Sequence, residues 1–253
     1  MNNFFKLGEN VIFENAMGTF SNQHFFVLFL TIILGAYMIW DYNRSTDKKK
    51  YRQRLAKFIV LVVLSRHIVE FLTGQYTVHR LPLHLCTVGA FFKLYDAYRE
   101  NIYTKEIFFI ITFPAALIAN IFPDWTNQPL VNFNTWQQFL FHALLVNYVL
   151  MRLFAGEITP HLKKIWIPIA SLTFFIPLML VINGFLGTNF FFVSTYSPNS
   201  PLEVIYLQFG SALYLPIFLF IVFILFIGIY GLLGLYRFLC AYLNPKKKWE
   251  IEV

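Results

Sequence analysis

Stretches of about 20 apolar residues recur along the chain, and they limit its possible folds more than any other feature. A helix of that length crosses the hydrocarbon core of a bilayer. Only 13% of the residues are charged, and the alternating segments of membrane β-barrels are absent. The pattern predicts an all-α, polytopic membrane protein with seven transmembrane helices. The predicted spans are Phe25–Trp40, Leu55–Gly74, Leu83–Tyr98, Lys105–Phe122, Thr135–Phe154, Lys164–Phe185 and Gly210–Phe238.

Lysine and arginine concentrate in every second connection between these spans. The connection 41–57 carries seven of them, whereas the connection 187–209 carries none. Because positively charged loops stay in the cytoplasm, the N-terminus is expected outside and the C-terminus in the cytoplasm. These loops also account for the net charge of +7, so no nucleic-acid partner is expected. No repeat or linker divides the sequence, and residues 1–253 are expected to form one domain.

The polar residues of the predicted spans gather in their outer halves. Arg66 and His67 lie about halfway across the second span, and Glu70 lies one turn nearer the outside. Ionisable groups in a bilayer cost several kcal/mol unless they face protein or water. We therefore expect a polar cavity that opens to the outer leaflet. The other candidate residues are His84 and Cys86 in the third span, His142 in the fifth, His24 at the edge of the first, and Asn183 and Asn189 after the sixth.

Each of these residues also has a structural reading. Arg66 and Glu70 are four apart on one helix, so they can simply neutralise each other as an ion pair. His67 can be a hydrogen-bonded packing residue, and His24 can be an interfacial residue without a role. A lone Cys86 behaves in most proteins as a small hydrophobic residue.

Cys86 is the candidate nucleophile if a base lies within hydrogen-bond reach, because a thiol needs one to become a thiolate at neutral pH. Residues two apart on a regular helix point in nearly opposite directions. His84 can therefore serve only if Pro82 leaves the first turn irregular, and His142 or His67 is the alternative base. Zinc would need three or four converging ligands, yet no HxxxH or CxxC spacing is present. A nucleotide motif is also missing, so we expect no metal and no diffusible cofactor.

Three segments, "FSNQHFFVLFL", "LPLHLC" and "GTNFFFVSTYSPNSPLEVIYL", resemble the YwaF-type integral membrane proteins of low-GC Gram-positive bacteria. That group is similar to the eukaryotic transmembrane protein 164 family. The segments occur in the family order, and the resemblance covers most of the chain. It implies an acyltransferase of the bacterial plasma membrane, which moves a fatty acyl chain from a phospholipid to a lysophospholipid. By its motif, the resemblance gives the required cysteine as Cys86 and its neighbour as His84.

The sequence therefore predicts acyl transfer through a thioester on Cys86, to a lysophospholipid or a lipidated acceptor. Arg66 would bind phosphate or the oxyanion, with Glu70 orienting it or His67. Asn183, Asn189 and His24 are further substrate contacts in this prediction. A transporter remains the alternative, as does a metal-binding or structural membrane protein. Transport would require polar groups through the full depth, and the inner halves of spans one, two, five and seven read as almost purely apolar.

Overall fold

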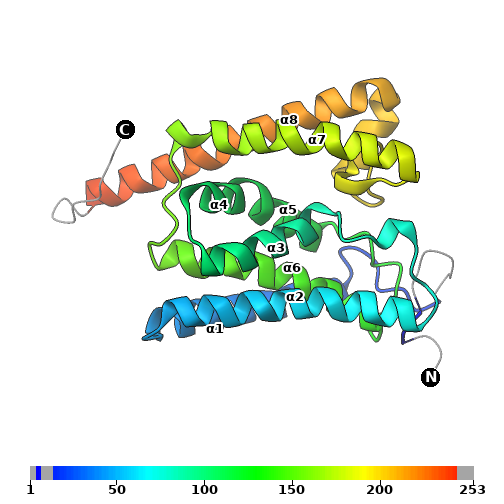
Figure 1. The fold of residues 1–253 in the computed structure, drawn as a ribbon, viewed down its shortest axis with the longest axis horizontal. Helices are drawn as coiled ribbons and strands as arrows, with labels where there is room; N and C mark the ends of the chain where they lie inside the picture. Colours follow the sequence, from blue (N-terminus) through cyan, green and yellow to red (C-terminus); the bar gives the residue numbers. More distant parts are fainter. Residues whose placement is uncertain (1–3, 7–13, 244–253) are drawn as a thin grey trace.

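The computed structural model describes residues 4–6 and 14–243, and throughout these residues the regular structure is helical. Figure 1 shows the long helices lying side by side along one axis. Short 3₁₀ turns and one π-helical turn, η2, complete the fold. The elements are α1 (Asn22–Arg44), α2 (Lys48–Leu72), η1 (Val78–Arg80), α3 (Leu85–Tyr98), α4 (Ile102–Ile107), η2 (Phe108–Thr112), α5 (Phe113–Ile121), α6 (Phe133–Phe154), η3 (Leu162–Lys164), α7 (Trp166–Leu186), η4 (Phe190–Phe192) and α8 (Pro201–Leu243).

Side-chain caps fix where several of these helices begin. Ser21 accepts the backbone N–H of His24 at the start of α1, and Asp47 accepts that of Lys50 at the start of α2. Asn132 caps α6 in the same way. Such caps satisfy N–H groups that have no partner within the helix. The chain therefore leaves and re-enters helices at short polar stretches of its sequence.

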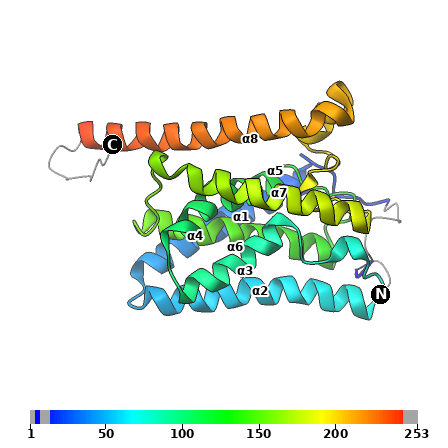
Figure 2. The ribbon, with the colours of Figure 1, turned by 45° about the horizontal axis from the view of Figure 1, so that its top comes forward.

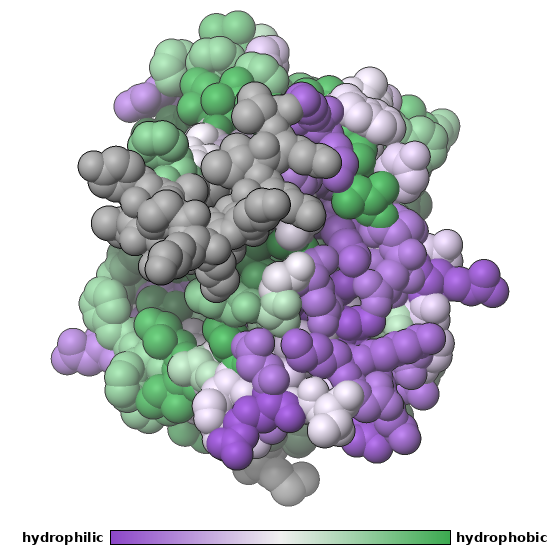
Figure 3. Space-filling view, turned by 90° about the vertical axis from the view of Figure 1, so that its left-hand side faces the viewer, coloured by the Kyte–Doolittle hydropathy of each residue, from purple (hydrophilic) through white to green (hydrophobic). Residues whose placement is uncertain are grey.

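The helices alternate in direction, so the connections gather at two ends. One end, here called the basic end, carries the connections 45–47, 99–101 and 155–165 (left in Figure 1). The other, the cavity end, carries the connections 73–84, 122–132 and 187–200. Figure 3 shows the basic end, where hydrophilic residues gather over one side of the face. The lysine-rich connections of the sequence are thus neighbours in space.

Four helices of the described residues are long and apolar enough to cross a membrane. Each of the seven predicted spans overlaps a helical segment, although the seven crossings themselves stay a prediction, and two differences concern α3 and α8. First, α3 has 14 residues and is shorter than a bilayer is thick. Second, residues 201–209 form the first part of α8, separated from its longer part by a break at Gly210, although the sequence had predicted a loop there. The four candidate spans are Asn22–Arg44, Ile102–Ile121, Leu162–Leu186 and Pro201–Leu235.

The core of the bundle is built around α6, which is buried over nearly its whole length. Apolar side chains of α2, α3, η2 and α6 form one large cluster there. In contrast, α7 and α8 lie together along one side of the bundle (Figure 2), and most of their apolar surface is exposed. Helices that are apolar on an exposed face are typical of contact with lipid.

A buried ionic network fills the interior at the basic end. Arg152 of α6 is fully buried and pairs with Asp96, and it also bonds Glu157 at 3.1 Å. The Glu157 carboxylate in turn accepts hydrogen bonds from the Arg52 guanidinium at 2.7 Å and from the Tyr42 hydroxyl at 2.5 Å. These contacts tie α1, α2, α3 and α6 together. They correct the expectation that the inner half of the fifth span is almost purely apolar, because Arg152 lies inside it.

Candidate functional site

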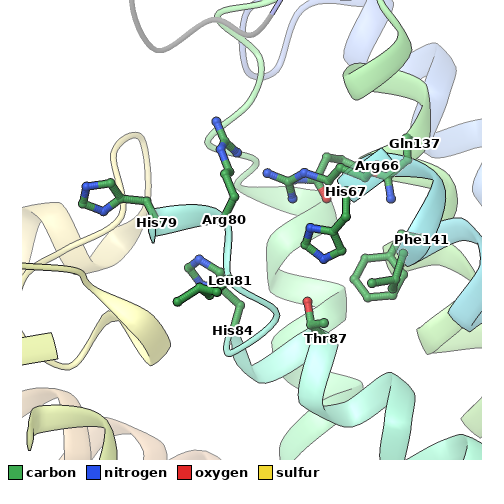
Figure 4. Close-up of a pocket in the computed structure, with 11 residues that line it drawn as sticks. Arg66, His67, His79, Arg80, Leu81, His84, Thr87, Gln137 and Phe141 are labelled. Atoms are coloured by element: carbon green, nitrogen blue, oxygen red, sulfur yellow. The ribbon is translucent and has the colours of Figure 1, made fainter. Parts of the chain in front are cut away.

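The connection between α2 and α3 lies at the cavity end of the bundle, and its last part builds one wall of a polar cavity. Four of its residues, His79, Arg80, Leu81 and His84, line the space (Figure 4). Irregular backbone at membrane depth is stable only where protein or a water-filled cavity satisfies its polar groups. The connection 73–84 can therefore precede a short α3 within the membrane, because the cavity can satisfy the polar groups of its irregular backbone. The other lining residues are Val63, Arg66 and His67 of α2, Thr87 of α3, and Gln137, Gln138 and Phe141 of α6.

The cavity has a free volume of about 20 Å³, enough for one water molecule. Its lining is rich in groups that can carry positive charge. Glu70 lies behind them, almost fully buried, and accepts a hydrogen bond from Arg66 Nε at 2.7 Å. Arg80 Nη1 lies 3.8 Å from the same carboxylate oxygen, and His67 Nδ1 lies 3.8 Å from the other one. One carboxylate thus faces two arginines and a histidine.

His142 lies on α6, one turn beyond Gln138, and is buried. Its ring stacks on Trp125 with centroids 5.0 Å apart. Because Nδ1 contacts the Gln138 carbonyl at 2.8 Å, and a carbonyl only accepts, Nδ1 must carry the proton. The second nitrogen, Nε2, is then left with a lone pair, which is the form that a general base needs.

Cys86 and His84 begin α3. His84 is the N-cap residue with extended backbone, so Pro82 and its neighbours do leave this turn irregular. The His84 ring packs against Phe190 at 5.1 Å and Phe192 at 5.9 Å. Cys86 is half-buried and packs against the core cluster. Its sulfur makes no hydrogen bond to any described residue, so neither His84 nor His142 contacts it in this conformation.

A second, apolar cavity lies on the other side of the same turn. Leu85, Val88 and Gly89 of α3 line it, together with residues of η2, α7 and η4. Its free volume is again about 20 Å³. Since His84 and Thr87 line the polar cavity, the turn that holds Cys86 separates a polar space from an apolar one.

Asp124, in the connection between α5 and α6, adds an acidic group near the cavity. Its carboxylate accepts the Ser197 hydroxyl at 3.4 Å. Loss of water around the carboxylate raises the pKa of Asp124, and the positive charges of Arg66 and Arg80 oppose that rise. The residue as a whole nevertheless keeps an exposed surface.

Three predicted substrate contacts are occupied by interactions within the protein. Both ring nitrogens of His24 are used, with Nδ1 accepting the Phe20 N–H at 3.0 Å and Nε2 donating to the Asn120 carbonyl at 2.9 Å. The Asn183 amide bonds both the N–H and the carbonyl of Phe190. Asn189 bonds the backbone of Thr195 in the same double fashion. These contacts hold the ends of α1 and α7 and the loop after α7.

Among the described residues, no three His, Cys, Asp or Glu side chains converge as metal ligands. The histidines of the cavity instead lie beside arginine and glutamine. Sequence reasoning missed Arg80, His79, Gln137 and Gln138 as lining residues. Arg80 opens the "RLPLHLC" stretch that holds the cysteine motif, which was the available signal.

Residues 19–230 match the sequence profile of the TMEM164 family. The chain belongs to the TMEM164 family. The match runs from the cap of α1 to the greater part of α8 and includes the whole site described above. This confirms the resemblance seen in the sequence at the level of the TMEM164 family. Membership and the four long apolar helices together identify a multi-pass membrane protein. No curated protein and no solved structure gives a significant match.

Proposed function

We propose that this protein is a membrane-embedded acyltransferase that works through a thioester on Cys86. The donor would be a phospholipid, and the acceptor a lysophospholipid or a lipidated molecule. One observation carries the proposal: the motif cysteine lies in the first turn of α3, between His84 and Thr87, and these two neighbours line a cavity that holds two arginines and three histidines. Membership in the TMEM164 family supports it.

The polar cavity suits a lipid phosphate. Arginine matches phosphate geometrically, and Arg66 and Arg80 both lie beside the Glu70 carboxylate at the wall of the cavity. The amides of Gln137 and Gln138 add further hydrogen-bonding groups to the wall. With room for a single water molecule, the cavity must widen to admit a headgroup. Outward movement of the connection 73–84 would do so without disturbing α6.

The chemistry then needs one proton carrier. The neutral imidazole takes the proton of the Cys86 thiol as the sulfur attacks the ester carbonyl carbon, and the imidazolium so formed gives that proton to the departing lysophospholipid oxygen. The acceptor hydroxyl next attacks the thioester and gives its proton to the neutral imidazole, which restores the thiol or thiolate. His142 has the tautomer for this role, because its Nδ1–H is held by Gln138. His84 is nearer along the chain and remains the second candidate.

The proposed topology has seven spans, with the N-terminus outside and the C-terminus in the cytoplasm. Residues 1–253 would form one domain in the bacterial plasma membrane. Under this topology α2, α3 and α6 also cross the membrane. Of these, α6 is buried in the bundle, whereas α2 exposes apolar side chains such as Leu61 and Phe71 on the outside of the bundle. The cavity end then lies at the outer leaflet and the basic end at the cytoplasm.

The direct test uses purified protein in vesicles that contain a phospholipid with a labelled acyl chain and an unlabelled lysophospholipid. We expect Cys86→Ala and Cys86→Ser to abolish label transfer, while Cys240→Ser retains it. Mass spectrometry of the wild type should find the acyl group on the peptide that contains Cys86. Undiminished transfer by Cys86→Ala would rule out the thioester. His142→Ala and His84→Ala then decide between the two bases.

Transport is the second candidate, and a specific observation favours it. Polar side chains are buried along α3 from the cavity to the basic end, with Lys93 bonded to Thr112 and Asp96 paired with Arg152. This line weakens the sequence argument against a path across the membrane. A transporter would move its substrate equally well with Cys86→Ala. Flux measured in proteoliposomes with this variant therefore separates the two functions.

A further inference from the structure

One wall of the apolar cavity is formed by a residue with a strained backbone. Leu85 and Val88 of α3 line this cavity, and residues of α4, η2 and α7 form most of the remaining wall. Of the described residues that line it, Phe191 alone lies in the connection 187–200. Phe191 has φ 62°, and its neighbour Phe192 has φ 54°. Bulky residues rarely adopt positive φ, and backbone strain of this kind gathers at functional sites.

Contacts from two helices hold this strained turn in place. The Asn183 side chain of α7 accepts the N–H of Phe190 at 2.8 Å and donates to its carbonyl at 3.1 Å. The Tyr214 hydroxyl of α8 donates to the Phe192 carbonyl at 2.7 Å. The residues on both sides of Phe191 are therefore fixed, and Phe191 itself is buried at the wall of the cavity.

The lining of this cavity suits an apolar ligand. Its two hydroxyl side chains, Ser171 and Thr112, each bond the backbone carbonyl four residues earlier, at 2.9 Å and 3.3 Å. The other residues that line it are apolar. A bound water needs two or more polar partners, so such a space does not favour water. The helix α7, which forms one wall, exposes apolar side chains such as Phe174 on its other face, as is typical of contact with lipid.

We propose that the apolar cavity binds an acyl chain of the lipid substrate, and that the Phe191 ring closes it and limits the length of chain that it admits. The free volume of about 20 Å³ is too small for a chain, so part of the wall must move. Phe191 is the residue best placed to do so, because the other lining residues lie on longer helical segments and its own backbone is strained. Its ring stacks on Phe175 of α7 with centroids 6.2 Å apart, so an entering chain would lie beside Phe175. This inference rests on the proposed acyl transfer, which identifies the ligand as a lipid.

The first test locates the chain without any chemistry on it. The full-length protein with Cys86→Ala is placed in lipid nanodiscs with a lysophospholipid that carries a photoreactive diazirine at the end of its acyl chain. After illumination, mass spectrometry identifies the labelled residues. We expect label on Phe175, which lines the cavity, and also on Phe174, which bulk lipid reaches and which serves as the internal reference. Label on Phe174 without label on Phe175 would overturn the proposal.

Two matched variants of α7 show whether the label on Phe175 comes from the cavity. Ser171→Leu places a larger side chain in the cavity and should lower labelling of Phe175, relative to Phe174, at least threefold. Thr173→Leu is the control, because Thr173 bonds its own helix in the same way, at 2.9 Å, but is exposed. Its labelling ratio should stay within twofold of the parent protein. Equal ratios in the two variants would contradict a chain in the cavity.

The second test addresses Phe191 through chain length, with a series of probes whose acyl chains become longer. Phe191→Gly and Phe192→Gly each replace a strained residue by one that adopts positive φ freely, so they share any effect on the backbone. Only the first removes a ring from the apolar cavity, since the Phe192 ring packs on His84. We expect Phe191→Gly to raise labelling of Phe175 by the longest probe at least threefold, and Phe192→Gly to leave it within twofold. The same change in both variants would overturn the role of the Phe191 ring. If a glycine variant does not fold, Ser171→Leu still tests the site.

These readouts do not require acyl transfer, because Cys86→Ala cannot form the thioester. Labelling that depends on Ser171 and Phe191, in a protein whose wild type transfers no acyl group, would retain the chain site and reject the acyltransferase. Acyl transfer by the wild type, with labelling that both changes leave unaltered, would reject the chain site alone.

Discussion

The Glu70 carboxylate supplies negative charge beside the arginines of the polar cavity, and changing Glu70 to glutamine tests how much that charge stabilises the protein. The Glu70 side chain is 1% exposed, while those of Arg66 and Arg80 are 19% and 11% exposed. Glutamine keeps the size and a hydrogen-bond acceptor but removes the negative charge. The change removes one negative charge from beside the guanidinium groups of Arg66 and Arg80.

The cost follows from the burial of the pair. Neutralising one partner of a buried ion pair destabilises a protein by about 3–5 kcal/mol. Both arginines keep contact with a polar cavity, so we expect the lower figure, about 3 kcal/mol. For a chain of this size that corresponds to a fall in Tm of roughly 6–12 °C.

The assay is thermal unfolding in detergent with and without inorganic phosphate. Asp47→Asn is the matched control, since it makes the same acid-to-amide change on the same helix at an exposed N-cap, where asparagine caps as well as aspartate. Its Tm should stay close to that of the wild type. Phosphate should raise the Tm of Glu70→Gln more than that of the wild type, because the anion replaces the lost charge. A Tm of Glu70→Gln equal to that of the control would refute the reasoning.

Three other outcomes are expected. Gly35→Ala should cost about 1–3 kcal/mol, because its Cβ would lie 2.6 Å from Asn147 Oδ1, whereas Gly184→Ala meets nothing within 4 Å and should be neutral or stabilising; chemical denaturation measures both. Asn183→Ala should cost roughly 2–4 kcal/mol through its lost hydrogen bonds, and proteolysis within the loop 187–200 should accelerate. Because the pKa of Asp124 is raised in the folded protein, its contribution to the free energy of unfolding is greatest below about pH 4 and is lost as the pH rises through the raised pKa. Asp124→Asn should therefore flatten that part of a plot of stability against pH.

The helices were predictable because each long apolar run is limited by polar residues that cap it. The predicted spans began at Phe25 and Leu55, whereas the caps Ser21 and Asp47 start α1 and α2 three and seven residues earlier. The start of α8 was placed wrongly because Gly210 looks like a boundary. In the structure it is a left-handed break, with φ 73° and ψ 175°, between two helical parts. Apolar content indicates length well, but it does not distinguish a kink from an end.

The cavity was predictable only in part. Depth along the predicted helices brought Arg66, His67 and His84 together, and all three line it. The contributions of His79 and Arg80 were missed because segment 73–84, outside the predicted helices, has no helical periodicity. Lys93 was not among the candidate residues that the sequence suggested. Its contacts with the π-helical turn depend on packing between α3 and η2, which no local pattern encodes.

The position of the candidate nucleophile explains why a cysteine would follow a histidine and a proline at the start of this helix. A phospholipid ester joins a charged headgroup to an apolar chain, so its carbonyl lies at the boundary between the two environments. The turn of α3 that holds Cys86 lies at the corresponding boundary, because His84 and Thr87 line the arginine-lined cavity and Val88 lines the apolar one. If this is the basis of catalysis, a shorter acyl chain on the donor and the loss of its phosphate should each weaken binding, and the two effects should be independent. Val88→Phe, which fills the apolar cavity, should change only the dependence of binding on chain length. Arg80→Gln should change only the dependence of binding on the phosphate.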